Sequence, residues 1–126
     1  METSPRYLWD RATKRSSSVP HEVNAIVVQN IEVSPGLESL RLVPDGWELA
    51  DFTPGQFAVV GLPGSATRCG ISEPEDEARD PKKLIKRAYS IASSSVAKEF
   101  LELYIVLVPS GALTPRLFNL TAGDRV

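Results

Sequence analysis

The stretch LELYIVLVPSGALTPRL, residues 101–117, sets the expected fold. In its first part Leu101, Leu103 and Ile105 alternate with Glu102 and Tyr104. Successive side chains of a strand point to opposite faces, so the three apolar residues would line a core while the other two face outward. The stretch therefore predicts a half-buried β-strand at residues 100–108, followed by a turn.

The residues after this strand, PSGALTP at positions 109–115, predict a turn and the start of a short helix. Thr114 is a good N-cap, and Pro115 suits the first helical turn because its missing N–H would have no partner there. We expect the helix to run to about Leu120, with Gly123 ending the segment. A helix start carries free backbone N–H groups and a positive dipole end, which bind phosphate readily, although most helix starts bind only water.

Short runs rich in Val, Ile and Leu, each bounded by turn residues, occupy much of the remaining chain after Pro20, and no window has a long helical period. This texture is typical of a small antiparallel all-β protein. In the first run we expect Val23, Ala25 and Val27 to point inward and, past a bulge, Ile31 and Val33 to do the same. The strands are expected at residues 24–34, 40–43, 56–62, 87–92, 100–108 and, beginning at the end of the sequence, 124–126.

Composition bounds the class of protein. The chain has 126 residues, with 14 Lys and Arg against 16 Asp and Glu, which gives a net charge of −2. One domain fits this length, and the charge argues against a nucleic-acid partner. One Cys and one His exclude an internal disulfide and a multi-His metal site. No apolar run is long enough for a membrane span or a secretory signal, so we expect a cytoplasmic protein without a membrane partner. Residues 1–22 are expected to form a flexible tail before a domain at residues 23–126.

A long polar segment, Pro63 to Lys86, separates the third and fourth expected strands. Its acidic residues precede a basic group formed by Lys82, Lys83 and Lys86. Two interpretations stay open: the lysines form a docking patch for an acidic partner, or the segment is a solvated loop neutralised by its own acids. The second interpretation is the more common outcome for such a mixture of charges.

The tetrapeptide RAYS, residues 87–90, complements the turn at residues 109–115. Arg87 can grip phosphate oxygens with two N–H groups, and the ring of Tyr89 offers a flat surface for an aromatic heterocycle. Both residues project on one face of a strand, whereas Ser90 lies on the opposite face unless the strand twists or bulges. The competing interpretation is that Tyr89 is a rim aromatic and Arg87 a surface charge.

Several ordered motifs resemble the FAD-binding domain of bacterial ferredoxin/flavodoxin-NADP⁺ reductases, within the ferredoxin reductase-type flavoprotein superfamily. They are FTPGQF (52–57), GL (61–62), RAYS (87–90), the stretch 101–117 and AGD (122–124), and they extend in order from about residue 23 to the end. The resemblance implies a six-stranded antiparallel Greek-key barrel with one short helix, and FAD as the cofactor.

The resemblance also implies residue roles. Arg87 would meet the FAD pyrophosphate, Tyr89 would pack on the isoalloxazine and Ser90 would lie near the reactive flavin nitrogen, which makes Tyr89 and Ser90 the candidate catalytic residues. The next strand would line the flavin and the turn before the helix would receive the pyrophosphate. The full set of implied cofactor-binding residues is Arg87, Ala88, Tyr89, Ser90, Tyr104, Ile105, Val106, Leu107, Gly111, Ala112, Leu113 and Thr114.

The implied activity is electron transfer between NADPH and ferredoxin or flavodoxin through FAD. NADP(H) would need a nucleotide-binding α/β domain, which these residues cannot supply, and we expect the last strand to be cut off at Val126. Two alternatives change the partner: the reductase component of an oxygenase, or the electron-transfer subunit of a dehydrogenase. A third is a non-catalytic β-barrel binding module that has lost FAD.

Overall fold

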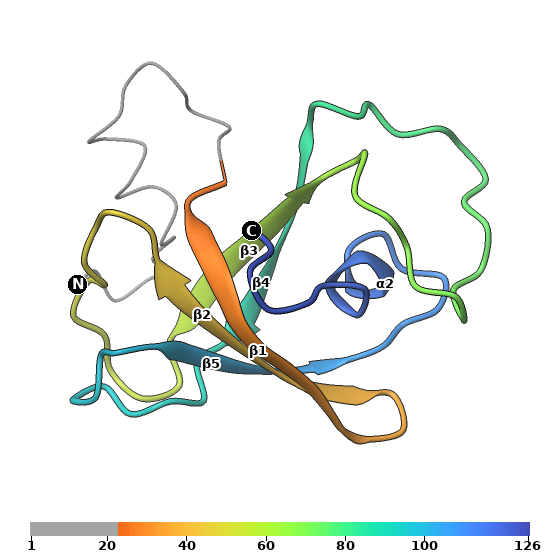
Figure 1. The fold of residues 1–126 in the computed structure, drawn as a ribbon. Coiled ribbons are helices and arrows are strands. Elements are labelled where there is room, and N and C mark those ends of the chain that lie inside the picture. The colour runs from red at the N-terminus through yellow and green to blue at the C-terminus, as the bar shows by residue number, and fades with distance from the viewer. Residues whose placement is uncertain (1–22) are drawn as a thin grey trace.

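The computed structural model describes residues 23–126, so the expected N-terminal tail at residues 1–22 lies outside the described residues. Within the described range, no helix is long and apolar enough to cross a membrane. Figure 1 shows the strands and the helix in chain order: β1 (Ala25–Ser34), β2 (Leu37–Pro44), β3 (Phe57–Pro63), β4 (Leu84–Ser90), β5 (Leu101–Val106) and α2 (Thr114–Leu117).

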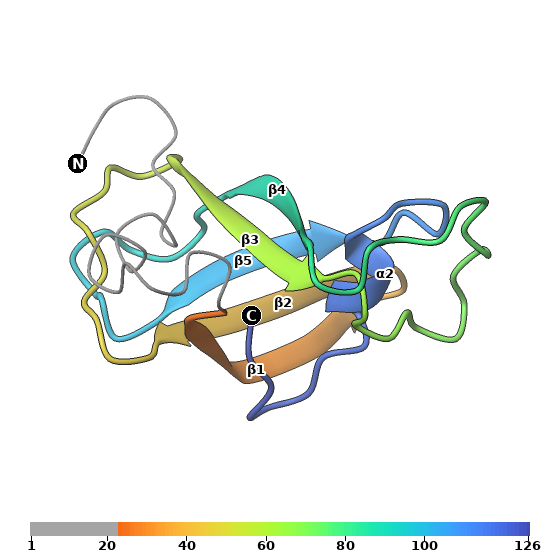
Figure 2. The same ribbon diagram turned by 90° about the horizontal axis from the view of Figure 1, so that it is seen from above.

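The strands form two antiparallel sheets. One sheet has the order β1-β2-β5, and the other pairs β3 with β4. Seen from above, β3 and β4 lie across the three-stranded sheet, while α2 sits near one end beside the long connection between β3 and β4 (Figure 2). One apolar cluster joins side chains from both sheets and α2, so a single core lies between them.

The all-β class with one short helix is confirmed, but a closed six-stranded Greek-key barrel is not. The structure has five strands in two open sheets. The sixth expected strand is reduced to a bridge between Arg125 and Ile26, where the carbonyl of Val126 accepts hydrogen bonds from the N–H groups of Asn24 and Ala25. In residues 23–126, β3 pairs with β4 alone, which leaves its other edge open.

The inward face of β1 differs from the expectation. Val27 is buried, as predicted, but the side chains of Ile31 and Val33 are about half exposed, so their inward assignment was wrong. The pairing register with β2 shifts between Val27 and Gln29. An extra residue at such a bulge exchanges the two faces of the strand, and Asn30, which pairs with the buried Leu40, turns toward the core side instead. A second shift, between Glu32 and Ser34, falls at Val33.

The core residues are mainly the alternating leucines and isoleucines of β2 and β5. Leu40, Leu101, Leu103 and Ile105 have no exposed surface, and burial of apolar surface is the main driving force for folding. Trp47 also belongs to the core, and its indole Nε1 donates a hydrogen bond of 2.7 Å to the carbonyl of Asn24.

One acid lies inside this apolar interior. Glu38 on β2 is only 2% exposed, and its Oε1 has no hydrogen-bond partner in the structure. Burial raises the pKa of Glu38 from 4.5 to about 8, against a smaller lowering by a hydrogen bond from Asn30. The side chain is therefore a neutral carboxylic acid at pH 7.

Replacement of Glu38 by Gln tests this assignment. The unfolded chain releases the Glu38 proton near pH 4.5, whereas the folded chain keeps it until about pH 8, so rising pH favours unfolding across that window. We expect Glu38→Gln to gain unfolding free energy relative to the wild type between these pH values, by up to about 1.4 kcal/mol per pH unit. Urea denaturation from pH 4.5 to pH 8.5 measures this, and parallel curves for the two proteins would contradict it.

Candidate functional site

Arg87 and Tyr89 lie on one face of β4. They pair with Val60 and Ala58 of β3 in an unbroken register. The side chain of Ile85 lies on the same face and is buried, so this face of β4 points toward the core near the start of the strand. Tyr89 packs against the core and is partly buried, whereas Arg87 is exposed. The predicted common face of the arginine and the tyrosine is confirmed.

The surroundings of Tyr89 keep its phenol neutral. Burial raises the pKa of Tyr89 to about 12; nearby Arg87 lowers it and Glu38 raises it further. The guanidinium of Arg87 donates a hydrogen bond of 2.7 Å from Nη1 to the carbonyl of Lys86. A flat neutral ring therefore lies two residues from a fixed positive charge.

Ser90 is the last residue of β4 and pairs with Phe57. The register between β3 and β4 has no bulge, so Ser90 and Ala88 lie on the face opposite to Arg87 and Tyr89. Both are exposed. The Ser90 hydroxyl therefore reaches the face that carries Arg87 only through the twist at the end of the strand.

The turn before α2 is closed by Thr114, though not in the predicted way. The N-cap is Leu113, which makes no side-chain capping bond, so the N-cap role of Thr114 was wrong. Its Oγ1 instead accepts a hydrogen bond from the N–H of Val108 at 2.9 Å and donates one to the carbonyl of Val108 at 3.2 Å. The N–H of Gly111 also reaches that carbonyl, where a Cβ on Gly111 would lie 3.1 Å away. This glycine makes the tight turn possible.

Three N–H groups of this turn, those of Ala112, Leu113 and Thr114, have no hydrogen-bond partner among residues 23–126. The helix that follows has only four residues, Thr114–Leu117, and is shorter than expected. A helix this short has a small dipole, so the turn offers hydrogen-bond donors rather than a helix field.

The candidate residues of β5 and its end face in two directions. Tyr104 and Val106 are exposed on the outer face, Ile105 is fully buried, and Leu107 is partly buried just past the strand. Only the first two can present their side chains to a ligand on the outside of the sheet. Ile105 has only its backbone to offer.

Residues 64–83 connect β3 to β4, and we refer to them as the strap. The strap is anchored by Arg116 of α2, whose side chain is 4% exposed. Its guanidinium donates to the carbonyls of Gly64 and Ala66, each at 3.0 Å, and forms a two-pronged contact with Glu75 at 2.7 and 3.3 Å. The bond from Arg116, with a further one from Arg79, lowers the pKa of Glu75 to about 2.

The strap also holds the turn before α2. Arg68 donates to the carbonyl of Gly111 at 2.8 Å and to that of Pro109 at 3.1 Å, and the N–H of Glu73 also reaches Pro109. Arg116 donates to the carbonyl of Ala112 at 2.7 Å. Sequence reasoning missed these contacts. The available signal was Arg116, a charged residue inside the apolar pattern of α2. We refer to its hydrogen bonds with the strap and the turn as the clamp.

A polar cleft of about 930 Å³ lies between the strap, β4 and the turn. Arg87 lines it, and Ser110 is its one lining residue from the turn. The turn residues that the resemblance implies for the pyrophosphate, Gly111 to Thr114, are not part of the lining, nor are Tyr89 and Ser90. The remaining lining residues are Glu73, Pro74, Glu75, Asp76, Glu77, Ala78, Arg79, Asp80, Lys83, Leu84, Ile85 and Lys86.

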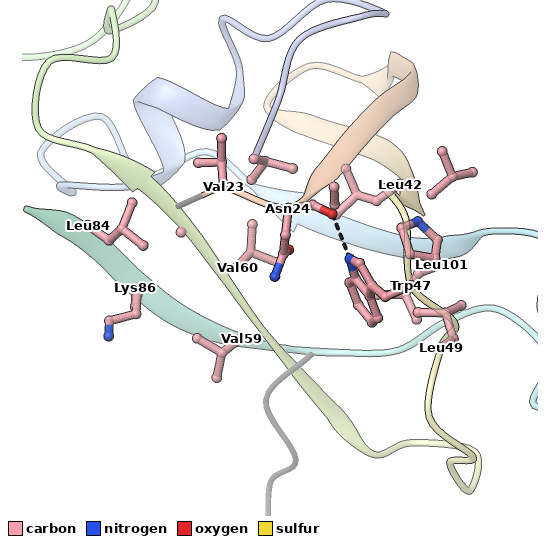
Figure 3. A pocket seen from close by; sticks show the side chains of 15 residues that line it. Val23, Asn24, Leu42, Trp47, Leu49, Val59, Val60, Leu84, Lys86 and Leu101 are labelled. Atoms are coloured by element: carbon pink, nitrogen blue, oxygen red, sulfur yellow. Dashed lines mark hydrogen bonds between the residues drawn. The ribbon is translucent and has the colours of Figure 1, made fainter. Parts of the chain in front are cut away.

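A second hollow is narrow and apolar, with a volume of about 40 Å³. Figure 3 shows its walls, which include Leu42, Trp47, Leu49 and Val60. Lys86 is the one ionisable residue in its lining. This apolar hollow therefore lacks the several polar groups that orient a reacting ligand. The polar cleft is the better candidate site.

Comparison with solved structures identifies the architecture. The chain is similar to a cytochrome P450 reductase from Amycolatopsis, with a TM-score of 0.56 and 27% identity over 82% of this chain. It also matches a ferredoxin NADP⁺ reductase from Neisseria gonorrhoeae with bound FAD and NADP, with a TM-score of 0.58 and 23% identity over 81% of this chain. The fold is that of the FAD-binding domain of the ferredoxin reductase-type flavoprotein superfamily.

A third similar structure in this superfamily is a flavohemoglobin from Malassezia yamatoensis with bound FAD and heme, at a TM-score of 0.55 and 17% identity over 87% of this chain. The chain spans 26%, 34% and 26% of the three structures in the order given. No protein-family model matches the sequence, and no curated protein matches it. The superfamily resemblance drawn from the motifs is therefore confirmed through the fold.

The clamp predicts how the strap responds to mutation. Replacement of Glu75 by Gln removes the charge that Arg116 contacts, and we expect trypsin to cut the strap after Arg79, Lys82 or Lys83 several-fold faster than in the wild type. The rate of appearance of the two fragments at pH 7.5 measures this. Glu77→Gln is the matched control, because Glu77 is exposed and forms no ion pair within the described range. Equal cleavage rates for all three proteins would show that the ion pair does not hold the strap.

Proposed function

We propose that the chain binds FAD and serves as the flavin-binding domain of an electron-transfer reductase, of the type that moves electrons between NADPH and ferredoxin or flavodoxin. The observation that supports this most is the joint placement of three features. Arg87 and Tyr89 share one face of β4, and Arg87 shares a cleft with the turn at Ser110.

The residues present fit a dinucleotide with a charged centre and a flat ring. A pyrophosphate needs positive charge and hydrogen-bond donors, which Arg87 and the unpaired N–H groups of Ala112, Leu113 and Thr114 supply. A flavin ring needs an apolar flat surface, and the neutral phenol ring of Tyr89 supplies it.

Bound FAD would supply the redox chemistry, taking a hydride from NADPH and passing electrons singly to an iron–sulfur or flavin protein. The chain's own residues bind and orient. Arg87 would hold the phosphate end, and Tyr89 would cover one side of the ring and exclude water. Ser90, on the opposite face at the end of β4, would donate a hydrogen bond near the reacting nitrogen only through the twist at the strand end. The neutral state of Tyr89 suits this role, because an ionised phenol would repel a reduced ring.

The physiological partner distinguishes two forms of this proposal. Ferredoxin or flavodoxin is the partner that the motifs favour, and the nucleotide-binding domain for NADP(H) would come from outside these residues. The reductase component of an oxygenase is the second candidate, which the 27% identity to a cytochrome P450 reductase favours. Both forms need flavin in the same place on β4, so one set of binding experiments tests what they share.

Replacement of Arg87 by Ala tests the phosphate contact. Charge-assisted hydrogen bonds of this kind contribute about 1.5–3 kcal/mol, so we expect FAD affinity to fall roughly 10- to 100-fold. Titration of the purified chain with FAD, followed by quenching of flavin fluorescence, measures the change. Lys98→Ala is the control, because Lys98 carries the same charge but pairs with Asp51 outside the cleft. A wild-type chain that binds no flavin would favour the binding-module alternative.

Replacement of Tyr89 by Leu tests the ring contact. An aromatic ring packed on flavin quenches its emission, so we expect the complex with the variant to fluoresce more brightly than the wild-type complex and to bind FAD several-fold more weakly. The emission of the saturated complexes gives the answer. Tyr104→Leu provides a comparison on β5, in the other sheet, and identical emission from the Tyr89 variant and the wild type would place the ring elsewhere.

A further inference from the structure

The polar cleft extends from Arg87 in the direction opposite to Tyr89. Tyr89 follows Arg87 along β4, at a distance of about 7 Å for two residues of a strand. The cleft is lined by the residues that precede Arg87, from Lys83 to Lys86, and does not include Tyr89. A ligand whose charged centre rests on Arg87 would therefore have one half toward the tyrosine and the other half in the cleft.

The far wall of this cleft belongs to the strap, and several contacts fix it in place. At the base, the N–H of Gly64 bonds to the carbonyl of Lys83 at 3.0 Å. A Cβ on Gly64 would lie 2.4 Å from the carbonyl oxygen of Asp80, so the two ends of the strap approach too closely for any other residue. Farther along, Arg116 holds Glu75 within the lining of the cleft. The wall is thus a built part of the fold.

The same clamp sets the orientation of the turn. The carbonyls of Gly111 and Ala112 accept hydrogen bonds from Arg68 and Arg116, respectively. In a trans peptide the N–H points opposite to the carbonyl of the same unit, so the N–H groups of Ala112 and Leu113 point away from the two arginines. The strap therefore fixes the direction of the donors as well as the shape of the cleft.

The lining chemistry matches a nucleoside phosphate. Lys83 and Arg87 bring positive charge to the lining, which also includes Ser110 of the turn. Asp76 and Glu77 contribute carboxylates, which accept hydrogen bonds from hydroxyl and amino groups. A ribose offers hydroxyl donors, and adenine offers an amino group.

We propose that the strap cleft binds the adenosine monophosphate half of the dinucleotide, so that the strap makes the site selective for FAD over FMN. This rests on the proposed function, because it places the second half of the same ligand. The volume of about 930 Å³ is at the upper end of the range for small-molecule sites and accommodates a nucleotide.

Titrations with FAD, FMN and riboflavin test the proposal on the purified chain. We expect the wild type to bind FAD at least about tenfold more tightly than FMN. Gly64→Ala and Glu75→Gln, which disturb the strap at its base and at its clamp, should reduce that ratio toward one while leaving the affinity for riboflavin unchanged. Ile71→Ser is the matched control, since Ile71 is an exposed strap residue outside the cleft lining, and it should keep the wild-type ratio.

A measurement on the wild type tests the proposal even where the variants fail to fold. FAD should slow tryptic cleavage after Lys83 and acetylation of its amine, whereas FMN at equal saturation should not. Equal affinities for FAD and FMN, or equal protection of Lys83 by both, would overturn the strap proposal while leaving flavin binding intact. Failure to bind even riboflavin would instead overturn the proposed function.

Discussion

The buried guanidinium of Arg116 is the constraint on which the site depends. A charged group that is 4% exposed is costly unless every donor finds an acceptor, and this one has Gly64, Ala66, Ala112 and Glu75 as partners. Those partners belong to the strap and to the turn before α2. Satisfying one cation therefore ties a long polar connection to a short turn.

Strand alternation then decides which residues face the cleft. On β4, the register with β3 puts Ile85, Arg87 and Tyr89 on one face, where Ile85 is buried, Arg87 is exposed and Tyr89 is partly buried. In the described part of the chain, β4 has no hydrogen-bonded neighbour on β5, because the two strands belong to different sheets. The arginine is thereby exposed at the cleft while the tyrosine still rests on the core.

The alternation of apolar and polar residues predicted most of the strands, because a half-buried strand buries every second side chain. The turn between β1 and β2 contains Gly36, which has φ of 77°, a conformation that glycine adopts easily. A bulge in β1 was expected, and the structure has one between Val27 and Gln29. Its effect on the two faces was not readable, because a register shift depends on the partner strand, and it reversed the assignment of Ile31. The clamp was equally hidden. Arg116 and Glu75 are 41 residues apart, and the spacing of charges within the strap says nothing about a partner on a distant helix.

The electrostatics of the site change in character along β4. Near Tyr89, two ionisable groups are held neutral: burial raises the pKa of Tyr89 to about 12 and that of Glu38 to about 8. Near Arg87, the clamp keeps Glu75 ionised by lowering its pKa to about 2, and bases face acids across the cleft. A neutral apolar end suits a ring that must gain and lose electrons, because a fixed negative charge there would oppose reduction. A charged, well-hydrated end suits phosphate and ribose. One strand thus carries both environments within a few residues.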